Sequence, residues 1–398
     1  MKKILFVVND FPNLTETFIV NKVVNLSKKS YSTYVLRHSS GRTLQSIDGE
    51  FSNILILDSL LVDFNFIKIL SSIIRKPFKS LLFLANKIRS GKSIYSSLRL
   101  LLKVLPILRV SPDIVHFEFS GIAVSYIEIL DDLKGVKIVV SCRNSAEQIK
   151  PILDSNRATS LAKVFNRADA VHCVSRYIEK ICKGYGLDTH KSFINYPSAD
   201  IRYLRYNKSI QYNNKQKDAV VISLIGRLHW VKGIEIALAA LGNSTMISSI
   251  ERVNIVGDGP EYDKIKFMVH DLALDDVVVF HGHLQKSHVR DILTETDILL
   301  LPSIMEGISN SAIEAMAMGK IVISSDTCGM PELISHGQNG FLFSKYNSHD
   351  LTLLIDKTVA NYSKMEDVRR NAAKTIEKSF CLDNQIDKFE EVYNKIVD

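Results

Sequence analysis

The chain has 398 residues, of which 46% are hydrophobic and 23% are charged, with a formal net charge of +7. This length is large for one hydrophobic core and favours two domains of about 150 to 200 residues each. The five cysteines are scattered and form no C-x-x-C pair, which argues against a disulfide framework or a structural zinc site and favours a reducing cytoplasm. The first apolar run is too short for a signal peptide, and no stretch of about 18 uncharged apolar residues could span a membrane.

The first half of the chain alternates short β-branched runs with amphipathic stretches. The runs predict strands over 3–8, 31–37, 53–57, 113–119, 137–142 and 170–175, and the stretches predict helices, for example over 15–29 and 176–186. Short, continuously apolar strands that alternate with helices indicate a parallel sheet covered on both faces.

Residues 64–112 carry ten basic side chains and no acidic one, interleaved with apolar runs at helical spacing. The cations are Lys68, Arg75, Lys76, Lys79, Lys87, Arg89, Lys92, Arg99, Lys103 and Arg109. Such a basic amphipathic segment predicts docking on an anionic membrane surface, because each cation near the surface adds about 1 kcal/mol. The alternative is a pair of core-packed helices with a solvated basic face. The interleaved residues are aliphatic rather than aromatic, which argues against nucleic acid as the partner.

The same alternation restarts after a polar stretch at 205–218 that has no apolar period. Further strands are predicted over 219–226, 252–257, 277–282, 297–302 and 320–325. We therefore predict an α/β protein with an N-terminal domain over 1–200, a linker over 201–217 and a C-terminal domain over 218–379. A last helix at about 380–398 is expected to pack back on the first domain. The carboxyl ends of the two parallel sheets would face each other across a cleft, where such sheets bind ligands.

Common phosphate-binding motifs are missing. The chain has no G-x-G-x-x-G after its first strand, no P-loop, and no D-x-D pair to hold a metal on a diphosphate. Two cations could hold a phosphorylated ligand instead. Arg227 ends the first strand of the second half, and Lys232 lies five residues on, before a helix. At the carboxyl end of a strand they would neutralise a diphosphate; the alternative is two surface cations beside a loop.

Glycines follow the next two strands of the second half. Gly257 and Gly259 form a tight turn after one strand, and Gly282 follows the other. Glycine allows the backbone to approach a ligand closely, although a plain turn explains these positions nearly as well.

The stretch EGISNSAIEAMAMG, residues 306–319, places Glu306 and Glu314 around a helix start. Ser309 or Asn310 is a good N-cap, and the free amides of 307–311 would form an anion site. Carboxylates beside a phosphate are unfavourable unless they accept hydrogen bonds from vicinal hydroxyls, such as those of a sugar and a ribose. The alternative is that Glu314 complements the helix dipole and Glu306 is a solvated loop acid.

In combination, these motifs resemble a known family. The segments 226–233, 256–261, 278–282, 297–303, 306–319 and 325–334 have the order and spacing of the GT-B-fold retaining glycosyltransferases of family 4, of the group 1 type. The resemblance covers essentially the whole second half. FPNLTETFI at 11–19 and RADAVHCVSRYI at 167–178 look like segments of the bacterial exopolysaccharide and lipopolysaccharide transferases of this family.

The resemblance implies two Rossmann-like domains facing across a cleft. It also implies a hexosyltransferase that moves a sugar from a UDP or GDP donor to a glycan or lipid-linked acceptor, with retention and without a metal. The process would be the synthesis of a bacterial surface polysaccharide such as capsule or lipopolysaccharide. Arg227 and Lys232 would hold the diphosphate, Glu314 the ribose hydroxyls and Glu306 the sugar hydroxyls. The other donor-binding residues would be Gly259, Gly282, Gly307, Ile308, Ser309 and Asn310.

The first domain would bind the acceptor. The acceptor-side candidates are Asn13, Thr15, Glu16, His116, Arg143 and Asn144. His116 fits a satisfied core histidine about as well, and Glu118 stands where relatives place a second histidine. We expect the protein in the cytoplasm, peripheral on the inner face of the cytoplasmic membrane.

Other functions stay open on this architecture. A phosphorylase, a sugar-nucleotide epimerase and a catalytically inactive partner subunit could all be built on it. A two-lobed sugar-binding protein should carry an export signal. The presence of Arg227, Lys232, Glu306 and Glu314 favours an active transferase.

Overall fold

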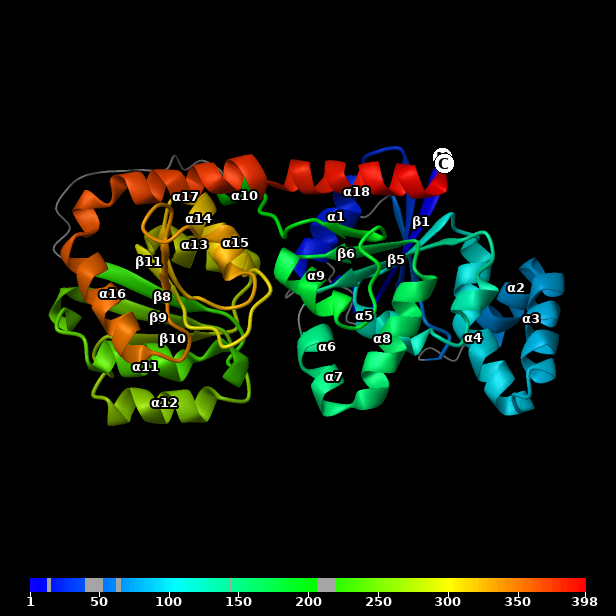
Figure 1. The fold of residues 1–398 in the computed structure, drawn as a ribbon, viewed down its shortest axis with the longest axis horizontal. Helices are drawn as coiled ribbons and strands as arrows, with labels where there is room; N and C mark the ends of the chain where they lie inside the picture. Colours follow the sequence, from blue (N-terminus) through cyan, green and yellow to red (C-terminus); the bar gives the residue numbers. More distant parts are fainter. Residues whose placement is uncertain (13–15, 40–52, 62–65, 144, 206–218) are drawn as a thin grey trace. The chain divides into compact units, whose positions relative to one another are not determined.

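The computed structural model describes residues 1–12, 16–39, 53–61, 66–143, 145–205 and 219–398. The chain divides into two compact units (Figure 1). Unit 1 consists of Met1–Val174, Ile178–Asn195 and Ile386–Asp398, and unit 2 consists of Ser175–Tyr177 and Tyr196–Gln385. Most of the predicted linker, residues 206–217, lies outside the described residues.

Unit 1 contains a sheet of seven parallel strands in the order β3-β2-β1-β4-β5-β6-β7. The strands are β1 Lys2–Val8, β2 Tyr31–Arg37, β3 Ile54–Asp58, β4 Ile114–Phe117, β5 Lys137–Cys142, β6 Ala170–Cys173 and β7 Ser192–Ile194. Five consecutive side chains of β1, from Ile4 to Val8, are fully buried, so both faces of this central strand are covered. The six predicted strands of this half are confirmed, and β7 was not predicted.

The helices of unit 1 connect these strands. They are α1 Thr17–Ser27, α2 Phe66–Arg75, α3 Pro77–Arg89, α4 Ile94–Val110, α5 Ser120–Ser125, α6 Ser145–Gln148, α7 Lys150–Leu153, α8 Ser155–Arg167 and α9 Arg176–Lys183, with a 3₁₀ turn at Leu130–Asp132. The basic segment thus forms three helices, α2 to α4, and α2 and α3 both pack on α4.

Unit 2 contains six parallel strands in the order β10-β9-β8-β11-β12-β13. The strands are β8 Val220–Ile225, β9 Ile250–Val256, β10 Val278–Gly282, β11 Ile298–Leu301, β12 Ile321–Ser325 and β13 Phe341–Phe343. The helices are α10 Ile201–Leu204, α11 Ile234–Gly242, α12 Tyr262–Asp271, α13 Lys286–Glu295, α14 Asn310–Ala317, α15 Met330–Leu333, α16 Ser348–Ala360 and α17 Glu366–Ser379. Three 3₁₀ turns lie at Trp230–Lys232, Ile247–Ser249 and Tyr362–Lys364.

Alternate residues of β11 enter two separate cores. On β11, Ile298 and Leu300 pack with α11, α12 and α16, whereas Leu299 and Leu301 pack with α13, α14 and α17. Helices therefore cover both faces of the sheet (Figure 1), and the carboxyl ends of its strands lead into loops at one edge.

The last helix, α18 Leu382–Val397, belongs to both units. Its first turn lies in unit 2, and the rest, from Ile386, lies in unit 1, where Phe389 and Tyr393 are buried. In the part of the chain that the structure describes, no helix is long and apolar enough to cross a membrane.

Candidate active site

Backbone segments converge at the carboxyl edge of the unit 2 sheet, and glycines permit the approach. A Cβ atom on Gly257 would lie 1.9 Å from Gly226 O, and one on Gly259 would lie 2.2 Å from Leu228 O. The loop after β9 therefore lies directly against the loop after β8. The glycines predicted to approach a ligand approach protein backbone here, which the structure needs whether or not a ligand binds.

The loop after β8 brings Lys232 and Glu306 together. Lys232 lies at the end of a 3₁₀ turn, and Gly233, with φ of 60°, packs against Pro302 O, where a Cβ atom would lie at 2.3 Å. The Lys232 side chain runs past Gly226, and its Nζ forms an ion pair with Glu306 Oε2. Their side chains are 25% and 12% exposed, so both remain accessible to a ligand. Two residues 74 positions apart thus form one charged pair.

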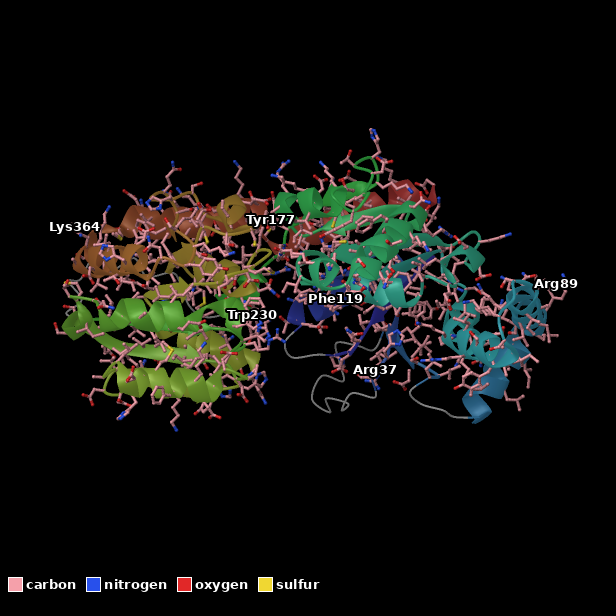
Figure 2. The ribbon with its side chains drawn as sticks, turned by 60° about the horizontal axis from the view of Figure 1, so that its bottom comes forward. Arg37, Arg89, Phe119, Tyr177, Trp230 and Lys364 are labelled. Carbon is pink, nitrogen blue, oxygen red and sulfur yellow. The ribbon has the colours of Figure 1, made fainter. Side chains whose placement is uncertain are left out.

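Arg227 lies in the same loop as Lys232 but is exposed, and within the described part of the chain no ion pair holds it. Trp230 follows in this loop and is 43% exposed (Figure 2). It is the only tryptophan of the chain. Its fluorescence can therefore report binding at this edge without added label.

Helix α14 begins at Asn310, as the sequence suggested. Its N-cap, Ser309, does not cap the helix with its side chain; Ser309 Oγ instead lies 2.9 Å from Ser311 Oγ. Gly307 and Ile308 precede the helix and lie against Gly329, where a Cβ atom would be 1.9 Å from Gly307 O. The start of α14 is thereby fixed beside the Lys232–Glu306 pair, with no side-chain cap on its amides.

Glu314 lies one turn into α14 and is half-buried. Burial raises the pKa of its carboxyl group to about 6, although Lys286 opposes the shift. Lys286 begins α13, and its Nζ lies 4.5 Å from the ring centroid of Tyr203, on which Arg290 also stacks at 4.9 Å. Lys286, Arg290 and Tyr203 were not predicted as site residues. Lys286 follows the loop after β10, at the same sheet edge as Arg227. This position after a predicted strand was the feature of the sequence that could have identified Lys286 as a site residue.

In unit 1, a buried charge cluster lies at the carboxyl ends of β4 and β5. Glu118 is fully buried and forms ion pairs with Lys22 Nζ and, at 2.8 Å, with Arg143 Nη2. Burial alone would raise the pKa of Glu118, but Lys22 and Arg143 outweigh it and the pKa is lowered. Burial lowers the pKa of Lys22 to about 8, and Glu118 limits the shift. The three charges form a tight unit (the Glu118 cluster).

Two acceptor-side candidates lie at the Glu118 cluster: Arg143 belongs to it, and Glu16 adjoins it. Arg143 is half-buried, donates from Nε to Glu118 O at 3.0 Å, and stacks on Phe18 at 4.3 Å and on Phe119 at 5.7 Å (Phe119 is labelled in Figure 2). Glu16 precedes α1; burial raises the pKa of its carboxyl group to about 6, opposed by Arg143. The carboxyl group of Glu16 and the guanidinium of Arg143 are thus close enough to interact electrostatically.

His116 occupies the core of unit 1. It is fully buried on β4, with Nδ1 2.5 Å from Tyr393 Oη and Nε2 2.8 Å from Ser141 Oγ. Burial holds its pKa well below the usual range. Both ring nitrogens are occupied, which is the arrangement of a satisfied core histidine. Three other candidates, Asn13, Thr15 and Asn144, lie outside the described residues.

Residues 206–375 match the family described as Glycosyl transferases group 1. The chain is 25% identical over 248 residues to the amylovoran biosynthesis glycosyltransferase AmsK of Erwinia amylovora, covering 61% of this chain and 60% of AmsK. It is 29% identical over 173 residues to the uncharacterised glycosyltransferase MJ1607 of Methanocaldococcus jannaschii, covering 42% and 43%. The alignments thus span less than two thirds of these relatives.

A solved structure shares the fold over the whole chain. The crystal structure of Anabaena HepE in complex with UDP-glucose has a TM-score of 0.74 and 18% sequence identity, covering 99% of this chain and 100% of that chain.

The glycine contacts predict a difference between two Gly→Ala variants. Gly259→Ala should destabilise unit 2 by more than about 3 kcal/mol, because its Cβ would force backbone apart. Gly282→Ala should lose only about 1–2 kcal/mol, since its φ of 63° is unfavourable for alanine but no atom lies within 4 Å of the new Cβ. Thermal unfolding followed by Trp230 fluorescence measures both. Equal losses would contradict the backbone-contact explanation.

Proposed function

We propose that this chain is a retaining hexosyltransferase, because residues 206–375 match the family described as Glycosyl transferases group 1 and the chain has the α/β GT-B fold with two Rossmann-like domains. It moves a sugar from a nucleoside-diphosphate sugar to a glycan or lipid-linked acceptor. The second domain binds the donor and the first binds the acceptor. The process is the synthesis of a bacterial surface polysaccharide; the relative AmsK is named for amylovoran biosynthesis.

The observation that carries this proposal is the pair of Lys232 and Glu306 at the start of α14. A lysine ammonium has three donors, so Lys232 can keep Glu306 and still donate to phosphate oxygens. Glu306, held by Lys232, accepts hydrogen bonds from hydroxyls of the donor sugar. The amides of Gly307, Ile308, Ser309 and Asn310 and the guanidinium of Arg227 complete the diphosphate site.

The chemistry follows from where charge develops. As the glycosidic bond breaks, negative charge grows on the leaving diphosphate, and Arg227 and Lys232 stabilise it more in the transition state than in the ground state. The departing phosphate oxygen takes the proton of the incoming hydroxyl on the same face of the sugar. That geometry retains the configuration of the anomeric carbon.

Glu314 and its neighbours bind the nucleoside. The carboxylate of Glu314 accepts hydrogen bonds from the ribose hydroxyls, and Lys286, which opposes the rise of its pKa, lies close enough to favour its ionised form. Gly259 lies in the loop after β9 and Gly282 at the end of β10, and both shape the loops of the donor site. HepE was crystallised with UDP-glucose, which makes uridine nucleotides the first to test and GDP the alternative.

Acceptor binding in the first domain involves Arg143 of the Glu118 cluster and the neighbouring Glu16. The ion pair with Glu118 fixes the guanidinium of Arg143, which can donate hydrogen bonds to a hydroxyl-bearing acceptor, and the carboxyl group of Glu16 can accept them. Asn13, Thr15 and Asn144 are the neighbouring candidates in the sequence. We place the reaction in the cytoplasm, at the inner face of the cytoplasmic membrane.

Variants of the charged pair separate diphosphate binding from sugar binding. Lys232→Ala and Arg227→Ala should each lower kcat/KM by about 10²–10³, equivalent to about 3–4 kcal/mol, and weaken UDP binding. Glu306→Gln should bind UDP at least as tightly as the wild type, because it removes a negative charge beside the phosphates, yet transfer should fall by a similar factor. Titration of Trp230 fluorescence with UDP and a radiolabelled transfer assay measure the two properties.

Lys357→Ala, on α16, is the control for loss of one lysine from unit 2 and should match the wild type in both assays. Wild-type turnover in Lys232→Ala and Arg227→Ala would refute the diphosphate assignment. Absence of transfer in the wild type with intact nucleotide binding would favour the inactive partner subunit.

The pKa of Glu314 predicts a pH dependence of donor binding. The carboxyl group is ionised above its pKa of about 6 and accepts hydroxyl hydrogen bonds; below that pH it becomes protonated. Affinity for a nucleotide sugar should therefore fall about fivefold from pH 6 to pH 5. The probe is a nucleotide sugar, whose esterified diphosphate does not titrate there as a terminal phosphate would.

Glu314→Gln supplies the control for this titration. It should bind the nucleotide sugar more weakly at pH 7.5 and lose the pH dependence between 6 and 5. Because the folded-state pKa is raised, the ionised carboxylate destabilises the fold at neutral pH, so Glu314→Gln should melt at or above the wild-type temperature. An unchanged pH profile in Glu314→Gln would assign the titration to another group.

Transfer is proposed to need no divalent metal, because Arg227 and Lys232 supply the positive charge at the diphosphate. Activity should survive dialysis against EDTA and should not rise on addition of magnesium or manganese. Activity that is lost on chelation and restored only by metal would show that the diphosphate is held in another way.

A further inference from the structure

The helices α2, α3 and α4 expose many apolar side chains. Nine of the nineteen large hydrophobic side chains that are exposed among the described residues lie between residues 70 and 98. Six belong to α2 and α3, namely Leu70, Ile74, Phe78, Leu81, Leu82 and Ile88, and Phe78 is 76% exposed. The other three, Ile94, Tyr95 and Leu98, lie on the first turns of α4. Soluble surfaces seldom gather apolar groups in this way.

The exposed side chains follow helical spacing. On α3, Phe78, Leu81, Leu82 and Ile88 lie on one side of the helix, whereas Ser80 and Phe83 are buried on the other. Leu70 and Ile74 are four residues apart on α2 and share one face. The inward sides of α2 and α3 pack on α4. The outward sides therefore form one apolar face (the α2–α3 face) in addition to a normal core face.

Seven of the ten basic side chains of this segment fall into two groups. Three are used within unit 1: Lys87 pairs with Asp132, Lys92 pairs with Glu128, and Lys103 donates to Ser125 O and lies over the Tyr126 ring at 4.3 Å. Four others are exposed, namely Arg75, Lys79, Arg89 and Arg99. Figure 2 shows Arg89 at the outer end of these helices. Arg75, Lys79 and Arg89 lie on the two helices that carry the α2–α3 face, and their exposed side chains are available to a partner.

We propose that the α2–α3 face docks on an anionic membrane leaflet. Its apolar side chains enter the boundary between headgroups and acyl chains, and the flanking cations contact lipid phosphates. A second copy of the chain is a poorer occupant, because Arg75, Lys79 and Arg89 are exposed on these two helices and two such faces would bring like charges together. The choice of the inner leaflet rests on the proposed function, but docking itself can be measured without transfer.

Co-sedimentation with vesicles tests the proposal on the full chain. Vesicles of phosphatidylglycerol mixed with phosphatidylcholine should retain the protein, and vesicles of phosphatidylcholine alone should retain much less. Phe78→Ser with Leu81→Ser should lower the partition coefficient about tenfold or more at every salt concentration, because the apolar contribution is not screened. Lys79→Glu with Arg89→Glu should release the protein chiefly at low salt, since charges act over about 10 Å at 0.1 M but only about 3 Å at 1 M.

Matched controls come from the same unit. Ile152 and Leu153 on α7 are 78% and 79% exposed, so Ile152→Ser with Leu153→Ser removes equally exposed apolar groups outside the α2–α3 face. Lys150→Glu with Lys163→Glu reverses two exposed cations elsewhere. Both controls should sediment like the wild type. Every variant should keep the wild-type far-ultraviolet circular dichroism and the UDP-induced change in Trp230 fluorescence.

Three results would overturn the proposal. They are absence of binding to either vesicle, equal release of the α7 control, and binding of Phe78→Ser with Leu81→Ser at the wild-type level. A wild-type dimer in sedimentation velocity that this variant converts to a monomer, without vesicle binding, would identify the face as a self-association surface. Vesicle binding without any response to nucleotides would instead refute the proposed function and leave docking intact.

Discussion

The site in unit 2 depends on a steric constraint: backbone segments approach one another so closely that no side chain fits between them. The loop after β9 touches the loop after β8 at Gly257 and Gly259, and the turn before α11 touches Pro302 at Gly233. Backbone hydrogen bonds join the same segments, from Gly226 N to Val256 O and from Ile304 N to Val231 O. This packing fixes the backbone on either side of Lys232, whose side chain runs past Gly226 and pairs with Glu306.

Unit 1 contains buried charges at the carboxyl edge of its sheet. Lys22 and Glu118 are both removed from water, which is unfavourable for each charge alone. Their mutual pairing, the guanidinium of Arg143, and the rings of Phe6 and Phe389 under the Lys22 ammonium at 5.3 Å and 4.5 Å offset that penalty. A carboxylate stays ionised deep in the protein and orients an arginine that is only half-buried. The buried Glu118 thus holds the half-buried guanidinium of Arg143 in one orientation.

The sequence predicted structure well where the local apolar pattern determines the secondary structure. Short apolar runs rich in β-branched residues predict buried parallel strands, and every strand predicted from such a run was found. The strands β7 and β13 have three residues each, too few for a periodic signal, and only pairing with a longer neighbour makes them strands. The fold class and the elements around Arg227, Glu306 and Glu314 could therefore be predicted from local pattern.

Contacts between residues that are distant in the sequence could not be predicted in this way. Nothing near Lys87 indicates that its ammonium meets Asp132, 45 positions away, or that Lys92 meets Glu128. A count of cations without acids therefore overstated how many are available on the surface. His116 shows the same limit, because the hydroxyl beside its Nδ1 comes from Tyr393, 277 positions later. Side-chain roles that depend on tertiary partners need the fold.

The position of Tyr393 and Phe389 within unit 1 has a consequence for the order of folding during synthesis. Of the two units, unit 1 begins to be synthesised first, yet it lacks part of its own core until α18 is made, because α18 fills the space beside His116, His172 and Phe193. Unit 2 has no such dependence on the final helix beyond Gln385. The N-terminal domain should therefore be the later of the two to reach its native packing. A released chain that ends at residue 385 would hold a completed unit 2 and a unit 1 whose polar core residues are still open to water.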